Sequence, residues 1–151
     1  MSNYDASRPN ARRYPRVLTM NDIASMPRLE FNTGIDTGLC LSQERDDARY
    51  FRQGICFAKP DHAPVNWNQA NFDETQFCLT GMIRLRVRDA RGREVVLEAA
   101  PNEHIYLPAG YTYTLENTGI ESTFLWTSGP SAPVGIVEAP AYSKQLRALR
   151  K

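Results

Sequence analysis

The sequence contains few of the side chains that bind transition metals or form disulfides. Its only histidines are His62 and His104, so a site built from three imidazoles is impossible within one chain. Its cysteines, Cys40, Cys56 and Cys78, are odd in number and include no Cys-x-x-Cys pair, which argues against a disulfide framework. Such cysteine usage is typical of a reducing compartment, and we expect a cytoplasmic protein.

An excess of charge and long apolar runs are also missing. The 18 Lys and Arg residues nearly balance the 17 Asp and Glu residues, and the formal net charge is +1. No overall field therefore attracts nucleic acid or a membrane surface, and we expect neither as a partner. Residues 1–20 contain no apolar run long enough for a signal sequence or a spanning helix.

The rest of the composition indicates a globular β protein. The chain has 151 residues, of which 42% are hydrophobic, and this is enough for a core of ordinary size. Ten prolines and nine glycines divide it into short segments, as in all-β sandwiches and barrels. Strands are predicted at 39–41, 54–58, 75–79, 82–88, 94–98, 104–107, 112–115 and 123–127.

The two ends of the chain differ from this β region. Residues 1–15 are a basic N-terminal arm, which we interpret as solvated or loosely docked, with a transit peptide or a nucleic-acid arm as the alternative. Residues 16–137 are predicted to form a single domain, with one helical turn at 21–27. Residues 138–151 form a tail, in which residues 143–151 have the pattern of a short helix with a basic end.

Two segments resemble the paired motifs of the cupin superfamily. The second cupin motif is Gly, five residues, Pro-x-Gly, two residues, His, three residues and Asn. This chain has Asn102, Pro108-Ala109-Gly110, Tyr113 and Asn117 at that spacing. The histidine that usually holds a metal is therefore replaced by Tyr113.

The first cupin motif is His-x-His, three or four residues, Glu, six residues and Gly. Glu74 and Gly81 have the right separation. The two histidine positions fall on Asn68 and Ala70, or on Trp67 and Gln69 with the longer spacing. The resemblance implies an all-β, cupin-like double-stranded β-helix, that is, a jelly-roll barrel with short helical or irregular extensions at both termini. It also implies a homodimer, and a usual metal site that has lost its imidazoles.

A narrower resemblance is to the ethanolamine-utilisation Q-type cupins, which also lack the histidine pair. Phe72-Asp73-Glu74 and Gln76 fill matching places in the segment FDETQFCLTG, and Trp67 fits a tryptophan just before it. Gln76 replaces a carboxylate of that family. The resemblance implies the fold and a non-standard pocket. An acetate kinase activity is reported in that family, but this chain has no Gly-rich phosphate loop, so we do not infer kinase activity.

The motifs and the strand alternation together predict a site inside the barrel. The candidate catalytic residues are Glu74, a general acid or base if an apolar barrel raises its pKa, and Tyr113, which would position the substrate. The candidate ligand-binding residues are Gln76, Tyr111, Asn68, Trp67 and Asn117. Structural roles remain as alternatives: Glu74 neutralised by Arg52 or by tyrosine hydroxyls, tyrosines that only pack, and Asn117 in a turn.

Three functions are compatible with this site. The first is a metal-independent enzyme of lyase or isomerase type that acts on a small polar metabolite and needs no cofactor. The second is a binding or sensing module that uses the same pocket without turnover. The third is a metal-dependent enzyme with irregular ligands, for example His62 beside Glu74 and Gln76. We favour the first, because a carboxylate in an apolar space is costly.

Overall fold

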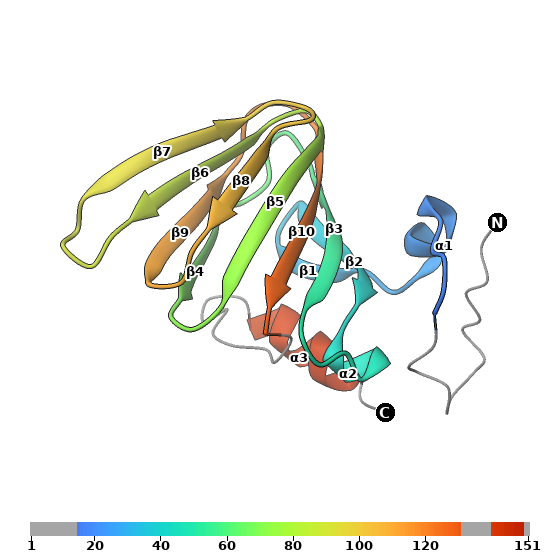
Figure 1. Ribbon diagram of the computed structural model, residues 1–151. Coiled ribbons are helices and arrows are strands. Elements are labelled where there is room, and N and C mark those ends of the chain that lie inside the picture. Colours follow the sequence, from blue (N-terminus) through green and yellow to red (C-terminus); the bar gives the residue numbers. More distant parts are fainter. Residues whose placement is uncertain (1–14, 131–139, 150–151) are drawn as a thin grey trace.

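Two antiparallel sheets make up most of the computed structural model, which describes residues 15–130 and 140–149 (Figure 1). The larger sheet has the strand order β1-β2-β3-β10-β5-β8. Its strands are β1 (Leu29–Asn32), β2 (Ile35–Leu41), β3 (Arg52–Ala58), β10 (Ser122–Gly129), β5 (Asp73–Thr80) and β8 (His104–Leu107).

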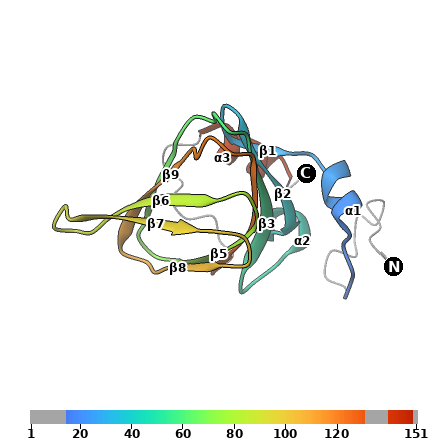
Figure 2. The same cartoon turned by 90° about the horizontal axis from the view of Figure 1, so that it is seen from above.

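The smaller sheet has the order β4-β9-β6-β7. Its strands are β4 (Val65–Gln69), β9 (Tyr111–Glu116), β6 (Ile83–Arg88) and β7 (Glu94–Ala99). Seen from above, the two sheets curve around a common interior, and the β6–β7 hairpin extends away from it (Figure 2). The predicted all-β architecture is confirmed.

All eight predicted strands are present, and most extend one to four residues beyond the predicted limits. The analysis of the sequence missed β1 and β4. β1 is a four-residue edge strand that pairs only with β2, so its conformation depends on that partner. β4 is rich in Asn and Gln, which are not typical strand residues, although its buried residues alternate as a strand requires.

The arginines of β6 lie on the outer face of the smaller sheet. Arg84 pairs with Glu98 and Arg86 pairs with Glu116, at 2.9 and 2.8 Å. The alternate residues of β6 are buried in the core, as the period of two along a strand requires. These arginines therefore pair with carboxylates of neighbouring strands on the solvent-facing side of the sheet.

In the described residues, three short helices accompany the sheets: α1 (Met20–Ser25), α2 (Gln43–Asp46) and α3 (Pro140–Ala148). The predicted turn at 21–27 is α1, which begins earlier because Thr19 caps it. The Thr19 hydroxyl accepts from the Asp22 amide, and the Asp22 carboxylate accepts from the Thr19 amide. No helix in the described ranges is long and apolar enough to cross a bilayer.

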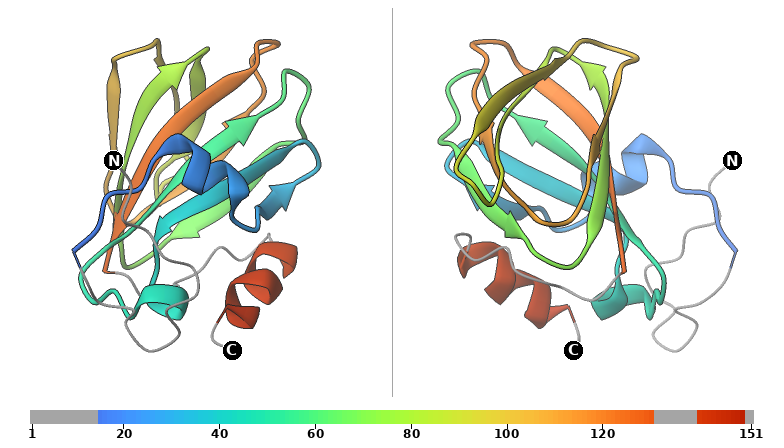
Figure 3. Two further views of the ribbon diagram at one scale, coloured as in Figure 1. Left: turned by 90° about the vertical axis from the view of Figure 1, so that its right-hand side faces the viewer. Right: turned by 60° about the vertical axis from the view of Figure 1, so that its left-hand side comes forward.

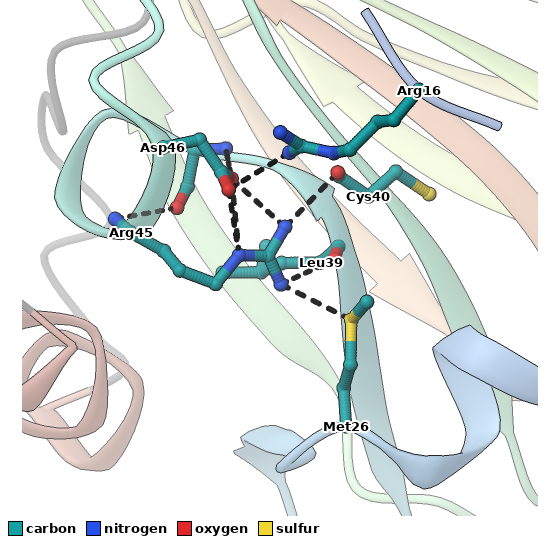
Figure 4. Close-up of polar contacts among 7 residues, drawn as sticks. Arg16, Met26, Leu39, Cys40, Arg45 and Asp46 are labelled. Carbon is teal, nitrogen blue, oxygen red and sulfur yellow. Dashed lines mark hydrogen bonds and ion pairs between the residues drawn. The ribbon is translucent and has the colours of Figure 1, made fainter. Parts of the chain in front are cut away.

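A polar cluster fixes α2 at the end of β2 (Figure 4). The Arg45 guanidinium donates to the carbonyl oxygens of Leu39 and Cys40 at 2.9 and 3.0 Å, and it also contacts the Asp46 carboxylate. Arg16 pairs with the same carboxylate at 2.8 Å. The cluster therefore ties the chain before α1 to the barrel through α2.

The C-terminal helix lies across one end of the barrel, on the same side as α2 (Figures 1 and 3). Tyr142 and Leu146, one helical turn apart, are buried in the core, and α3 packs against β1. The helix predicted at 143–151 is confirmed over 143–148, and α3 begins three residues earlier. The predicted domain boundary at 137–138 lies outside the described residues, as does most of the predicted arm.

Candidate functional site

A small cavity lies between the two sheets. The space open to the centres of water molecules is about 40 Å³. Most of the wall is apolar, and its main contributors are Phe31, Val65, Trp67, Phe72, Leu115, Phe124 and Trp126. The polar side chains in the wall are Arg52, Glu74, Gln76 and Tyr142. A mostly apolar space with a few convergent polar groups is typical of a small-molecule site.

Strand register brings the polar residues of the larger sheet together. On the central strand β10, Ser128 lies opposite Arg52 of β3 on one side and opposite Glu74 of β5 on the other. Gln76 is two residues along β5 and therefore points to the same face as Glu74. Adjacent strands thus place a guanidinium, a carboxyl group and an amide on one wall.

A glycine makes room for the tryptophan next to this group. Trp126 lies opposite Gly54, and a Cβ added to Gly54 would be only 2.6 Å from the indole ring. The indole Nε1 donates to the Thr37 hydroxyl at 2.9 Å. This arrangement fixes the orientation of the Trp126 ring, which forms part of the cavity wall.

Glu74 has an environment suited to proton transfer. Burial raises its pKa to about 7, while the hydrogen bond from Gln76 and the charge of Arg52 act in the opposite direction. Gln76 Nε2 donates to Glu74 Oε2 at 2.9 Å. Both protonation states are therefore populated at neutral pH, as general acid–base catalysis requires.

Arg52 is a buried cation in the same wall as Glu74, whose pKa its charge lowers. Its side chain is held by a hydrogen bond from Nε to the Ser128 hydroxyl at 2.9 Å. The guanidinium carbon lies 5.7 and 5.8 Å from the ring centroids of Phe72 and Trp126. Within the described residues Arg52 forms no ion pair, and its Nη1 is buried without a hydrogen-bond partner.

Two further polar atoms of the wall are also buried without partners. They are Gln76 Oε1 and the hydroxyl of Tyr142, whose residues are 3% and 2% exposed. The Tyr142 ring stacks on Phe31 at 4.7 Å between centroids. Burial raises the pKa of Tyr142 to about 12, so its hydroxyl is protonated and can donate at neutral pH. Buried polar groups are rarely left unpaired, and here they surround a cavity.

Tyr113 lies behind the cavity wall and not in it. Tyr113 is 1% exposed and stacks on Trp67 at 5.5 Å, but its hydroxyl donates to the Pro108 carbonyl at 2.7 Å. Tyr113 does not line the cavity, and neither does the partly buried Tyr111, whose ring centroid lies 6.2 Å away from that of Tyr113. These tyrosines support the wall behind Trp67 and do not contact the space inside.

The two asparagines predicted to bind ligand also lie elsewhere. Asn68 is exposed on the outer face of β4, because Trp67 and Gln69 on either side of it point inward. Asn117 follows the end of β9, is exposed, and donates to the His62 carbonyl at 3.3 Å. Asn117 thus has a backbone partner in a distant loop and does not reach the cavity. Of the predicted set, Glu74, Gln76 and Trp67 line the cavity.

The residues at the usual cupin metal positions do not fit a metal. Trp67 has no coordinating atom, and the hydroxyl of Tyr113 is already bonded to the Pro108 carbonyl. His62 is buried with Nδ1 2.7 Å from the Ala63 carbonyl oxygen, and it does not line the cavity. In the described part of the chain, no three His, Cys, Asp or Glu residues are grouped as metal ligands.

Two residues near the site were missed by the sequence analysis. Tyr142 lies about 70 positions after Glu74 in the sequence, and its only local signal is the apolar pair it forms with Leu146 on one face of α3. Glu44 on α2 is 2% exposed with both carboxylate oxygens unpartnered, and its charge acts on Tyr142. Arg52 was considered only as a counter-charge for Glu74.

Comparison with known proteins identifies the fold. No protein-family model and no curated protein matches the sequence. Among solved structures, a mutant of Bacillus subtilis oxalate decarboxylase matches with a TM-score of 0.63 and 13% identity, covering 74% of this chain. A second variant of that enzyme matches with a TM-score of 0.60 and 14% identity. The fold is that of a cupin.

The cupin fold predicted from the two motifs is thus confirmed. This chain spans 29% of the length of the oxalate decarboxylase chains that it matches. Clostridium difficile EutQ matches with a TM-score of 0.49 and 19% identity, covering 65% of this chain and 64% of that one. Asn102, where the second motif has glycine, has φ of 70°, a left-handed conformation that asparagine tolerates better than most residues.

Proposed function

We propose that this cupin binds a small polar metabolite in the cavity and catalyses a metal-independent proton transfer, of lyase or isomerase type, with Glu74 as acid and base. The observation that carries the proposal is the Glu74 carboxyl group in the cavity wall, hydrogen-bonded to Gln76, with a pKa of about 7. A carboxyl group with this pKa takes a proton from a substrate and returns it with nearly equal ease at neutral pH.

The neighbours of Glu74 support this role. The Gln76 amide fixes the position of Oε2, so the carboxyl group is oriented before a substrate arrives. The positive charge of Arg52 favours the ionised form, and burial favours the neutral form. The apolar walls formed by Phe72, Phe124 and Trp126 leave little water to compete for the proton. Tyr113 has no catalytic part in this proposal.

Deuterium exchange tests the proposal without knowledge of the net reaction. The full chain is incubated in D₂O with single members of a panel of small hydroxy, oxo and amino compounds, and NMR follows loss of carbon-bound hydrogen. We expect exchange in at least one compound, slowed by about 100-fold in Glu74→Gln. Glu121→Gln, at an exposed position, is the matched control and should exchange at the wild-type rate. Equal exchange in wild type and Glu74→Gln would contradict the proposal.

A binding or sensing module is the second candidate. It is favoured by the three unpartnered atoms of Arg52, Gln76 and Tyr142, which can hold a ligand without any turnover. The two candidates differ in what Glu74→Gln does. In an enzyme this variant keeps ligand binding and loses exchange, whereas in a binding module the wild type shows no exchange and the variant changes only the affinity.

A further inference from the structure

We propose that the cavity binds a small monocarboxylate that carries a hydroxyl or amino group beside the carboxylate, with the carboxylate on Arg52 and Tyr142 and the neighbouring group on Gln76. This inference rests on the proposed function, because it names the class of molecule that the same cavity accepts. It is carried by three polar atoms, one from each of these residues, that are buried without partners in the wall of one cavity.

Arg52 specifies an anion. Its guanidinium is 2% exposed, its Nε is used by Ser128, and Nη1 has no partner. A buried cation is costly unless it is paired, and a carboxylate offers it a short, charge-assisted hydrogen bond. The hydrogen bond from Nε to Ser128 orients the guanidinium before binding, and the rings of Phe72 and Trp126 lie 5.7 and 5.8 Å from it.

Tyr142 and Gln76 specify the rest of the molecule. The Tyr142 hydroxyl is protonated at neutral pH and donates, which suits a carboxylate oxygen. Gln76 Nε2 is already bonded to Glu74, so the free Oε1 is an acceptor and requires a donor on the ligand. A hydroxyl or amino group meets this requirement. A second carboxylate would face this acceptor and Glu74 without a second cation, so dicarboxylates are disfavoured.

The volume limits the size of the ligand. About 40 Å³ of the cavity is open to the centres of water molecules, which is room for at least about three waters, because one water fills roughly 10–15 Å³. A space of this size suits a compound of about two or three carbons, such as glycolate, glycine or lactate.

Protonation of Glu74 should accompany binding. The titratable groups whose charges interact with Glu74 are Arg52 and Cys56 of β3, Tyr113 of β9 and Tyr142 of α3. Burial raises the pKa of Cys56, Tyr113 and Tyr142, so of these groups only Glu74 changes charge between pH 6 and 8. Ionised Glu74 repels a bound carboxylate, and the affinity should therefore fall by up to about tenfold for each pH unit above 7.

Calorimetric titration of the full chain with glycolate tests the inference. Glycolate should bind at least about tenfold more tightly than neutral glycolamide, cationic ethanolamine or the dicarboxylate malonate. Arg52→Met should weaken glycolate binding by at least about tenfold, and Tyr142→Phe by about three- to tenfold, while Arg52→Lys should retain part of the affinity. Glu121→Gln is the control, and Glu74→Gln should remove the pH dependence.

Several results would overturn the inference. They are binding of glycolamide or ethanolamine as tight as that of glycolate, or unchanged glycolate affinity in Arg52→Met or Tyr142→Phe. If Arg52→Met does not fold, the inference is tested by the glycolate affinity of Tyr142→Phe and by the comparison of glycolate with glycolamide. Arg52-dependent glycolate binding without deuterium exchange would leave this inference standing and end the catalytic proposal. Glu74-dependent exchange in a neutral compound only would leave the catalytic proposal standing and end the inference that the ligand is a carboxylate.

Discussion

Two buried glutamines on facing sheets differ in how many of their hydrogen bonds are satisfied. Gln69 on β4 is 0% exposed, and both ends of its amide are used: Oε1 accepts from Trp67 Nε1 at 3.0 Å, and Nε2 donates to the Leu107 carbonyl. Gln76 on β5 is 3% exposed, and only its Nε2 has a partner, Glu74. The Gln69 amide thus has a hydrogen-bond partner at both ends, whereas the Gln76 amide has one at its nitrogen only.

Tyr113 and Tyr142 differ in the same way, in whether the hydroxyl has a hydrogen-bond partner. The hydroxyl of Tyr113, in the smaller sheet, donates to the Pro108 carbonyl, whereas the hydroxyl of Tyr142 has no partner. The hydroxyl of Tyr113 and the amide of Gln69 therefore stabilise the barrel. In the proposed function, the unpartnered atoms of Arg52, Gln76 and Tyr142 bind the ligand, and this binding recovers the energy spent on their desolvation.

Substitution of the two glutamines should give the largest difference in stability. Gln69→Leu leaves the Trp67 indole N–H and the Leu107 carbonyl buried without partners, and we expect a loss of about 2–4 kcal/mol in the free energy of unfolding. Gln76→Leu removes one hydrogen bond and one unpartnered oxygen, so it should cost less than about 1 kcal/mol. Urea unfolding at pH 7 measures both. Equal losses would show that the contrast between the sheets has no energetic meaning.

The pH dependence of stability should reveal Glu74. Its folded pKa, about 7, is above the value of 4.5 expected for the unfolded chain, so the unfolded state releases its proton first as the pH rises. The contribution of Glu74 to the free energy of unfolding is fully present below pH 4.5. It is lost progressively as the pH rises to 7, by about 3 kcal/mol at most. Glu74→Gln should remove this decline and be more stable than wild type at pH 8.

Urea unfolding between pH 4.5 and 8 provides the measurement, with Glu121→Gln as the control that keeps the wild-type profile. A Glu74→Gln profile parallel to that of the wild type would mean that Glu74 titrates as in solvent, and the acid–base role would then lose its support.

The tyrosine pair should show a smaller effect. Tyr113→Phe leaves the Pro108 carbonyl without its donor and should lower the free energy of unfolding by about 1–2 kcal/mol. Tyr142→Phe removes a hydroxyl that has no partner, so it should be neutral or slightly stabilising. Thermal unfolding at pH 7 checks both variants. A larger loss for Tyr142→Phe would indicate a structural role for its hydroxyl.

Metal should have the smallest effect. Desalted protein from metal-supplemented medium is expected to contain little zinc, iron, nickel or manganese, and a chelator should leave the melting temperature unchanged. The reason is the donor set: Glu74 is the one good ligand at the usual positions, and the histidines are replaced by Tyr113 and by Asn68 and Ala70, or by Trp67 and Gln69 with the longer spacing. Elemental analysis of the desalted protein measures its metal content and tests this prediction. Near-stoichiometric metal that disappears in Glu74→Ala would return the protein to the metal-dependent cupins with irregular ligands.

Part of the site could be read from the sequence. The period of two along β5 places Glu74 and Gln76 on one face, and the motif spacing identifies that face as the inner one. The same reasoning placed Tyr111 and Tyr113 inward, and Tyr113 is indeed buried. It failed for their hydroxyls, because alternation gives the direction of a side chain and not the hydrogen-bond partner that its tip meets.

The sequence by itself determined the strands other than β1 and β4, the inner face of β5, and the fact that one chain cannot build a site from three imidazoles. Only the tertiary structure decided which polar groups remain unpaired. Arg52, Glu74 and Tyr142 lie on three separate segments that meet when β3 and β5 flank β10 and α3 packs across the end of the barrel. Hydrogen-bond satisfaction depends on these contacts between distant segments, and no local periodicity encodes it.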